Sequence, residues 1–525
     1  MKKLFLSGVA ACIYILTAML PGMAQNVSPF GVCMHLDGGE SRQMPENIQM
    51  VSGAGIRWIR ADFSWGSAES PQGNWHYDRL DRVVRETDQL GLNLLALLMG
   101  RPSWGRPVYE HLDEWLLYVE NVVTRYKDKV RCWEIWNETN LAPRFWDKLD
   151  DPENYAMVLK ATYKKIKAID PDLVVVYAGT AGIPMNYIER SFQAGAGEGF
   201  DKMAVHPYRP LMDTWETTLF YKKNIDDLRA LMTKYNIGHK EIWLTEMGIS
   251  TMVTVVNKNR NVFHDAKAET GKDWKVAVIC DDDFPVVAGN TAKNLFPASF
   301  RLDTLTFFSM MRARLSDYDA VFFPSAENTP LHINLTLTPY LTRYIRGGGK
   351  VLYDTGNGNI VYYGDGASKE TEQAYYVAQT MWLSLRFGVE KYFLYEFESS
   401  SSETNIFDRE ANFGLTHWGL SPKPAYHAYA TMCKLFPDGS KIDASIEWRQ
   451  KDCCVVGWKQ PDGTRVWAVW SPEGARKANI KIGRGLQKTL NCMGGEIPEV
   501  TVSSKTLDVG PGVVYLVGPE SLEIQ

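Results

Sequence analysis

The sequence predicts an α/β fold: a (β/α)8 TIM barrel that is interrupted by a small α/β domain before its eighth strand and followed by a C-terminal β-sandwich domain. Short apolar runs alternate with longer amphipathic stretches from about residue 28. Such alternation indicates parallel strands, because these need crossover connections. The rhythm breaks after residue 251 and returns near residue 370. From residue 437 it gives way to short alternating strands, which are typical of an all-β domain.

The barrel is expected to comprise residues 28–251 and 370–436, which together have the size of one barrel. We expect its helices to include residues 80–90, 112–126, 155–169, 371–387 and 425–435. Its first seven strands are expected at residues 31–35, 56–62, 93–99, 131–138, 173–178, 203–206 and 241–246, and its eighth at residues 391–396.

The interrupting module is expected to span residues 252–369 and the C-terminal all-β domain residues 437–525. In the module we predict strands at residues 274–280, 318–323 and 349–353, with helices at 304–315 and 339–346. The C-terminal domain is expected to contain strands at residues 453–459, 465–471, 477–482 and 513–517.

Residues 1–24 are typical of a secretory signal peptide. Lys2 and Lys3 precede an apolar stretch that ends in small residues, and cleavage is expected after Ala24. The protein would then be exported to the periplasm or the cell exterior. A retained membrane anchor and a lipoprotein attached through Cys12 are the less favoured alternatives. The mature chain would keep seven cysteines, which we expect to be mostly free, buried thiols with at most one or two disulfides.

Composition narrows the class of protein. There are 57 basic and 62 acidic residues, a net charge of −5, without a long block of one sign. This disfavours nucleic acid as a partner, which usually needs a basic patch. No second stretch is apolar enough for stable membrane insertion. Aromatic residues reach 12%, including 17 Trp. They fit either a large core or a set of platforms for sugar rings.

Two glutamates close predicted strands. Glu138 ends the fourth and Glu246 the seventh, and active sites of (β/α)8 barrels lie at these carboxyl ends. Two carboxylates at strand ends can hydrolyse a glycosidic bond, with one as acid and the other as nucleophile or base. A single strand-end glutamate would more often form a structural ion pair. The two together favour catalysis.

The sequence around both glutamates resembles glycoside hydrolase clan A. Residues 136–140, WNETN, look like the motif that ends the fourth strand of that clan, and residues 244–248, LTEMG, look like its nucleophile motif. Connections also resemble those of families 39 and 5. The resemblance implies a retaining β-glycosidase that hydrolyses O-glycosidic bonds of oligo- or polysaccharides by double displacement. Glu138 would be the acid/base, Glu246 the nucleophile and Asn137 a ligand of the sugar 2-hydroxyl.

Further substrate-binding candidates share this end of the barrel. Arg60 resembles the clan arginine that contacts the nucleophile. Structural roles are the alternative for Arg60, His206, His35 and Glu396. Trp104 follows strand three and is the best candidate for a sugar platform, ahead of Trp65 and Trp146. The other candidates end strands one, six and eight: His35, His206, Tyr208, Tyr395 and Glu396.

The interrupting module resembles the flavodoxin-like, class I glutamine-amidotransferase-like domain that follows the barrel in family 42 β-galactosidases. There it builds a trimer, whereas here it lies ahead of strand eight. It lacks the nucleophile cysteine of a working amidotransferase, so we expect it to be non-catalytic. It is expected to wall one end of the cleft or to form a homo-oligomer contact.

Two alternatives to hydrolysis of a sugar stay open. One is a non-hydrolytic carbohydrate-binding protein on a barrel scaffold, and the other is an unrelated barrel enzyme. Cysteine pairs with histidine partners, HxH strand ends and a Gly-rich phosphate loop are missing from the sequence, so neither a metal nor a cofactor is expected. β-Galactosides, β-mannosides, β-xylosides and β-glucosides all fit as substrates. Exo action is favoured if the module closes the cleft.

Overall fold

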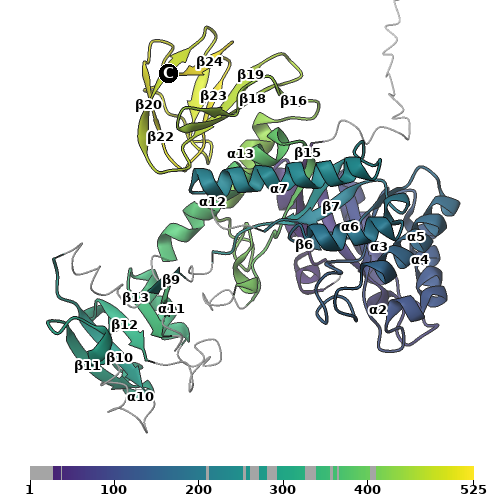
Figure 1. Cartoon of the computed structure of the whole chain (residues 1–525), viewed down its shortest axis with the longest axis horizontal. Coiled ribbons are helices and arrows are strands. Elements are labelled where there is room, and N and C mark those ends of the chain that lie inside the picture. Colours follow the sequence, from purple (N-terminus) through teal and green to yellow (C-terminus); the bar gives the residue numbers. More distant parts are fainter. Residues whose placement is uncertain are drawn as a thin grey trace, which may run out of the picture.

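The structure is a computed structural model (Figure 1). It describes residues 28–36, 38–208, 212–251, 256–259, 271–280, 292–324, 338–354, 359–363, 366–401 and 409–525. The predicted signal peptide, residues 1–24, lies outside these ranges, as does Cys12.

The barrel sheet runs in the order β5-β4-β3-β2-β1-β15-β8-β7-β6 and its paired strands are parallel. It closes because a parallel bridge joins Val176, the last residue of β5, to Lys202, which directly precedes β7. The predicted fifth strand, residues 173–178, is shortened to Val174–Val176 and is followed by a separate two-residue strand at Thr180–Ala181, and the predicted fourth ends at Ile135 rather than at residue 138. The strands are β1 (Phe30–Met34), β2 (Trp58–Ser64), β3 (Asn93–Met99), β4 (Cys132–Ile135), β5 (Val174–Val176), β6 (Thr180–Ala181), β7 (Met203–His206), β8 (Ile242–Met247) and β15 (Val389–Leu394).

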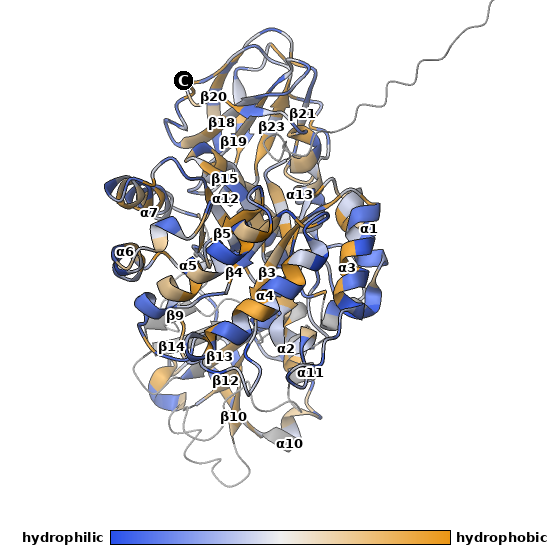
Figure 2. Ribbon diagram, turned by 90° about the vertical axis from the view of Figure 1, so that its right-hand side faces the viewer, coloured by the Kyte–Doolittle hydropathy of each residue, from blue (hydrophilic) through white to orange (hydrophobic). Residues whose placement is uncertain are grey.

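Amphipathic helices surround the strands and bury their apolar faces against them (Figure 2). Helix α4 has the predicted bounds, because Trp115, Val119 and Val122 recur at helical spacing and are buried. The helices of the barrel are α1 (Glu46–Gly53), α2 (Trp65–Ala68), α3 (Asp78–Gln89), α4 (Leu112–Tyr126), α5 (Pro152–Ile169), α6 (Met185–Gln193), α7 (Trp215–Lys234), α12 (Gly366–Arg386) and α13 (Pro424–Leu435).

Between β8 and β15 the chain forms a separate six-stranded sheet of order β11-β10-β12-β13-β14-β9. The strands from β10 to β13 pair in parallel, whereas β14 and β9 are antiparallel additions. Its elements are β9 (Val256–Asn259), β10 (Lys275–Cys280), β11 (Arg301–Thr306), α10 (Phe307–Met310), β12 (Ala320–Phe323), α11 (Thr338–Arg346), β13 (Lys350–Asp354) and β14 (Asn359–Tyr363).

The predicted helix at residues 304–315 is wrong. Thr304, Leu305 and Thr306 belong to β11, where they pair with β10. Two β-branched residues in this run suit a strand, and only the short helix α10 follows it.

The C-terminal part consists of a six-stranded and a three-stranded sheet. Val455 and Leu516 of the first share a core with Ile480 and Leu507 of the second. The strands are β16 (Lys441–Ile442), β17 (Arg449–Gln450), β18 (Cys453–Lys459), β19 (Arg465–Trp470), β20 (Arg476–Ile482), β21 (Lys488–Leu490), β22 (Thr506–Val509), β23 (Val514–Val517) and β24 (Leu522–Ile524). This part and the β9–β14 sheet lie at opposite ends of the molecule in both views (Figures 1 and 2).

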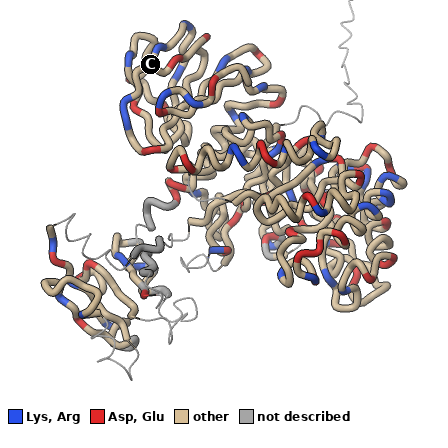
Figure 3. Tube along the Cα trace, viewed as in Figure 1, with Lys and Arg blue, Asp and Glu red and all other residues tan. Residues whose placement is uncertain are grey.

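All seven cysteines that the structure describes are free and buried. Basic and acidic residues are interspersed along the described trace (Figure 3). Of the helices in the described ranges, none is both long and apolar enough to cross a bilayer.

Candidate active site

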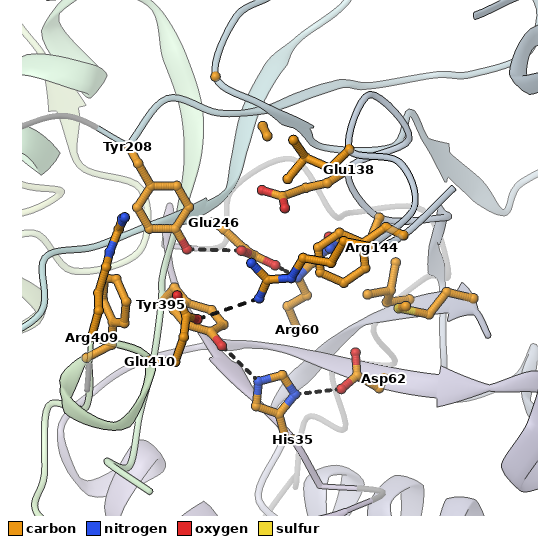
Figure 4. Close-up of a pocket in the computed structure, with 18 of the residues that line it drawn as sticks. His35, Arg60, Asp62, Glu138, Arg144, Tyr208, Glu246, Tyr395, Arg409 and Glu410 are labelled. Carbon is orange, nitrogen blue, oxygen red and sulfur yellow. Dashed lines mark hydrogen bonds and ion pairs between the residues drawn. The ribbon is translucent and has the colours of Figure 1, made fainter. Parts of the chain in front are cut away.

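A cavity of about 490 Å³ lies at the carboxyl ends of the barrel strands (Figure 4). Seven of the twelve candidate residues line it, as does a second group that the sequence did not reveal. The seven are His35, Arg60, Asn137, Glu138, Tyr208, Glu246 and Tyr395. The barrel therefore brings residues from distant parts of the chain to one site, as its topology requires.

Glu138 enters the cavity through an irregular end of the fourth strand. Regular pairing stops at Ile135, and Trp136 and Glu138 then adopt positive φ angles of 73° and 41°. A bridge between Asn137 and Gly179 keeps this segment attached to the fifth strand. Left-handed backbone at a non-glycine residue is rare and is common at functional sites. Here it turns two consecutive side chains, Asn137 and Glu138, into the same cavity.

Glu246 is held from both sides. Its Oε1 accepts a hydrogen bond from Nη1 of Arg60 at 2.6 Å, and its Oε2 accepts one from the hydroxyl of Tyr208 at 3.0 Å. Burial alone would raise the pKa of Glu246, but the electrostatic interactions with His206 and Arg60 and the Tyr208 hydrogen bond lower it below its ordinary value. Glu246 is therefore an ionised carboxylate at neutral pH.

Arg60 ties together three strands. Besides Glu246, it donates through Nε to Glu134 at 2.5 Å and through Nη2 to Asn137 at 2.8 Å. Burial favours the neutral form, yet the carboxylates of Glu134 and Glu246 raise the pKa of Arg60 well above its usual value. The guanidinium thus orients both the candidate nucleophile and the candidate 2-hydroxyl ligand.

His206 is fully buried beneath the two glutamates. Its Nδ1 lies 3.0 Å from Oε1 of Glu138 and 3.6 Å from Oε2 of Glu246, and its Nε2 lies 2.9 Å from the hydroxyl of Thr245. Residue 179 must be glycine here, since a Cβ at that position would stand 1.8 Å from Nε2 of His206. His206 ends β7 next to both glutamates, but it does not line the cavity.

A second acidic cluster surrounds His35 at one side of the cavity. Its Nδ1 lies 2.6 Å from Asp62, and its Nε2 lies 3.3 Å from the Tyr395 hydroxyl (Figure 4). Nε2 also lies 3.5 Å from Glu396. Burial opposes the charge, but Asp62 above all raises the pKa of His35 well above its ordinary value. Burial raises the pKa of Glu396 to about 7. Glu396 does not line the cavity and contacts it through His35.

Glu138, His206 and Glu246 each offer one ligand-type atom, and these three atoms lie within 4.8 Å of one another. Two carboxylates and an imidazole can also bind a metal ion. Here both oxygens of Glu246 and both ring nitrogens of His206 already have partners, and the Arg60 guanidinium disfavours a second cation. We interpret the three groups as a proton-transfer cluster.

The predicted tryptophan platforms need correction. Trp65 and Trp146 are fully buried, so neither presents a ring face to a ligand. Trp65 packs against Trp104 and Trp115, and Trp146 packs against Trp136. Trp104 is half-buried and does not line the cavity. The rings that line the cavity are Phe145, Tyr208, Tyr395 and Phe413.

Several cavity residues escaped the sequence analysis. Asp62 ends a predicted strand and could have been found in the same way as Glu138. Glu134 does not line the cavity; it lies inside a strand, and only its hydrogen bond with Arg60 connects it to the site. Arg144, Phe145, Arg409, Glu410 and Phe413 belong to connections that carry no periodic signal.

Residues 22–282 match the model of the cellulase family, glycosyl hydrolase family 5. No curated protein matches the sequence. A family 39 glycoside hydrolase from the gut symbiont Bacteroides cellulosilyticus WH2 has a similar structure, with a TM-score of 0.57 and 18% identity over 94% of this chain and 81% of that chain. A glucosidase from Croceicoccus marinus is similar as well, with a TM-score of 0.53 and 11% identity over 94% of this chain and 97% of that chain.

A family 39 β-xylosidase from Caulobacter crescentus is also similar, with a TM-score of 0.51 and 13% identity over 93% of this chain and 95% of that chain. At such identities these structures show a common fold only. The match to the family model adds the class of chemistry, and the resemblance of the two strand-end motifs agrees with it. The match to the family model and the two strand-end motifs therefore support glycoside hydrolase clan A for this chain, and with it the hydrolysis of glycosidic bonds.

Proposed function

We propose that the protein is a retaining β-glycosidase in which Glu246 is the nucleophile and Glu138 the general acid/base. One observation carries the proposal: one oxygen of Glu138 and one of Glu246 lie within 4.8 Å of each other in a common cavity. Retaining enzymes hold their carboxyl groups about 5–5.5 Å apart, whereas inverting enzymes need about 6.5–9.5 Å to admit a water molecule.

Two steps follow from this arrangement. In the first, Glu246 forms a bond to the anomeric carbon as the bond to the leaving oxygen breaks, and Glu138 gives that oxygen a proton. In the second, Glu138 takes a proton from water, which attacks the anomeric carbon and releases Glu246. Arg60 and Tyr208 keep Glu246 ionised and oriented for the attack.

The remaining cavity groups bind the sugar. Asn137, oriented by Arg60, meets the 2-hydroxyl, and His35 with Asp62 binds a further hydroxyl at the opposite wall. Tyr208, Tyr395, Phe145 and Phe413 supply the apolar surfaces. The module at residues 252–369 is taken as non-catalytic and amidotransferase-like, with a role in closing the cleft or in homo-oligomer contact.

The nucleophile assignment is tested with Glu246→Gln. The amide cannot form the glycosyl-enzyme, so turnover of nitrophenyl β-glycosides by the full chain should fall by at least about a thousandfold. Glu69→Gln is the matched control: Glu69 is equally buried but accepts from Trp65 and Gly73 away from the cavity. Turnover that persists in Glu246→Gln would contradict the assignment. Proton NMR of the first product should show the substrate's β configuration, and inversion would exclude double displacement.

Export is part of the proposal and rests on residues 1–24. The mature protein should begin at Gln25, which intact mass spectrometry of the exported protein measures. A mass that still includes residues 1–24 would show that the segment is retained, and a lipid adduct on Cys12 would show a lipoprotein.

A further inference from the structure

The two catalytic carboxylates are joined beneath the cavity by a chain of hydrogen bonds. From Glu138 it passes to His206 at 3.0 Å and to the hydroxyl of Thr245 at 2.9 Å. It continues to Glu134 at 2.8 Å and through Arg60 to Glu246. His206, Thr245 and Glu134 are fully buried, so water does not compete for these bonds.

The directions of these bonds follow from the donors present. Glu134 receives hydrogen bonds from Nε of Arg60, the backbone N–H of Gly179 and the hydroxyl of Thr245. Paired with a guanidinium and surrounded by donors, it acts as an acceptor only. Thr245 has a single hydroxyl proton and gives it to Glu134. Its oxygen must therefore accept from His206, which fixes a proton on Nε2 of the imidazole.

A proton on Nε2 decides what the other ring nitrogen can do. Nδ1 of His206 and Oε1 of Glu138, 3.0 Å apart, can bond only if one proton lies between them. Either Glu138 is a carboxylic acid that donates to a neutral imidazole, or an imidazolium donates to the Glu138 carboxylate. In both cases the Glu138–His206 pair holds one proton beside the leaving oxygen.

We propose that Thr245 and Glu134 are positioning residues that keep this proton on the Glu138–His206 pair, and that it is the proton Glu138 delivers to the leaving group. The inference rests on the proposed acid/base role of Glu138. In the glycosylation step the proton leaves Oε1 of Glu138 for the aglycone oxygen while the bond between that oxygen and the anomeric carbon breaks. Water returns a proton to the pair in the second step.

Charges from several strands face the pair. The anions Glu246 on β8 and Glu134 on β4 favour retention of the proton, whereas the cation Arg60 on β2 opposes it. Tyr208 after β7 and Cys33 on β1 complete the ionisable surroundings, since the Cys33 thiol contacts the Thr245 carbonyl and the Tyr208 hydroxyl contacts Glu246. Arg144 and Arg409 line the cavity further out.

Thr245→Val tests the proposal because it removes only the hydroxyl. The imidazole is then free to carry its proton on Nδ1, and Glu138 can face it as a carboxylate without a proton to give. For methyl β-glycosides, whose leaving group needs protonation, kcat/KM should fall about a hundredfold, the lower end of what general acid catalysis contributes. The alkaline limb of its pH profile should move to lower pH. For 2,4-dinitrophenyl β-glycosides, which leave without a proton, kcat/KM should stay within about threefold.

Two further variants separate this effect from simple damage. Thr87→Val is the matched control, because Thr87 is also buried but bonds only to the carbonyls of its own helix. It should leave both substrates unaffected. Thr245→Ser keeps the hydroxyl and should restore the rate on methyl glycosides.

Other outcomes overturn the proposal. Equal losses on both substrates would make Thr245 a packing residue only, and unchanged rates with an unmoved alkaline limb would show that the hydroxyl is dispensable. Glu138→Ala on the same two substrates tells the two ideas apart. Glu138→Ala could lower kcat/KM on methyl glycosides only, while Thr245→Val leaves kcat/KM unchanged on both substrates. The positioning role of Thr245 would then be wrong, and the acid/base role of Glu138 would stand. If Glu138→Ala also leaves kcat/KM unchanged on both substrates, the proposed function is wrong as well.

Discussion

The imidazole of His35 bonds to Asp62 and approaches Glu396, and its pKa is raised while that of Asp62 is lowered. Because its pKa is raised, His35 contributes its full stabilisation of the fold below the ordinary pKa of about 6.5. This contribution is lost as the pH rises through the raised pKa of the folded state. Asp62, whose pKa is lowered, contributes its stabilisation above about pH 3.9, and this contribution is lost as the pH falls through the lowered pKa of the folded state. The pair should therefore stabilise the fold most between about pH 4 and 6.5.

We expect His35→Gln to lower the melting temperature most within this window. Because the imidazole is 43% exposed, water screens the pair and its contribution should not exceed about 1 kcal/mol. Thermal unfolding of the full chain between pH 4 and 9 measures the difference from wild type. A difference that does not change with pH would show that His35 stabilises by packing alone.

Single residues differ in how well the sequence alone predicts where they lie. Glu138 and Glu246 could be found because each closes an apolar run, and the end of a barrel strand is a fixed place in the fold. Trp65 and Trp146 also follow strands, yet their rings turn into the aromatic layer around Trp115 and Trp136. The direction of a side chain beyond a strand depends on helix packing, which the local sequence does not specify.

Among the elements, helix α12 connects two parts of the molecule. Trp382 on this helix is fully buried, stacks on Trp458 of the C-terminal sheet at 4.2 Å and donates to the hydroxyl of Tyr515. It also meets Phe30 of the barrel edge-on at 6.0 Å. The two parts therefore share one core.

We expect Trp382→Ala to cost about 3–5 kcal/mol, as for large buried aromatic residues. Urea unfolding of the full chain should show a lower midpoint and separate transitions for the barrel and the C-terminal sheets. Trp418→Ala is the control, because Trp418 is 39% exposed and should cost far less. Equal midpoints for the two variants would contradict the shared core.

Elements were predictable where periodicity was strong. Helix α4 repeats apolar residues at helical spacing, and β3 is a continuous apolar run, so both have their predicted bounds. The run from Thr304 to Thr306 could be assigned to strand only through its pairing with β10. Between β5 and β6, Gly179 forms a bridge with Asn137, a tertiary contact that the local sequence does not specify.

At the scale of the whole molecule, the order of the domains could be predicted from the sequence, because the alternation of strands and helices stops after residue 251 and resumes near residue 370. The hydrogen-bond network of Arg60, Glu134, Thr245 and His206 could not be predicted from the sequence. It joins β2, β4, β8 and β7, and only the closed barrel brings these strands together.

Closure of the barrel also sets the order in which the protein can fold. Phe30 in the first strand pairs with Tyr392 in the last, and the β9–β14 sheet is synthesised between β8 and β15. Until β15 emerges, β1 and β8 each present an unpaired strand edge, and such edges invite aggregation. Contacts so distant in sequence also form slowly. The nascent chain therefore presents both edges until its final barrel strand is complete.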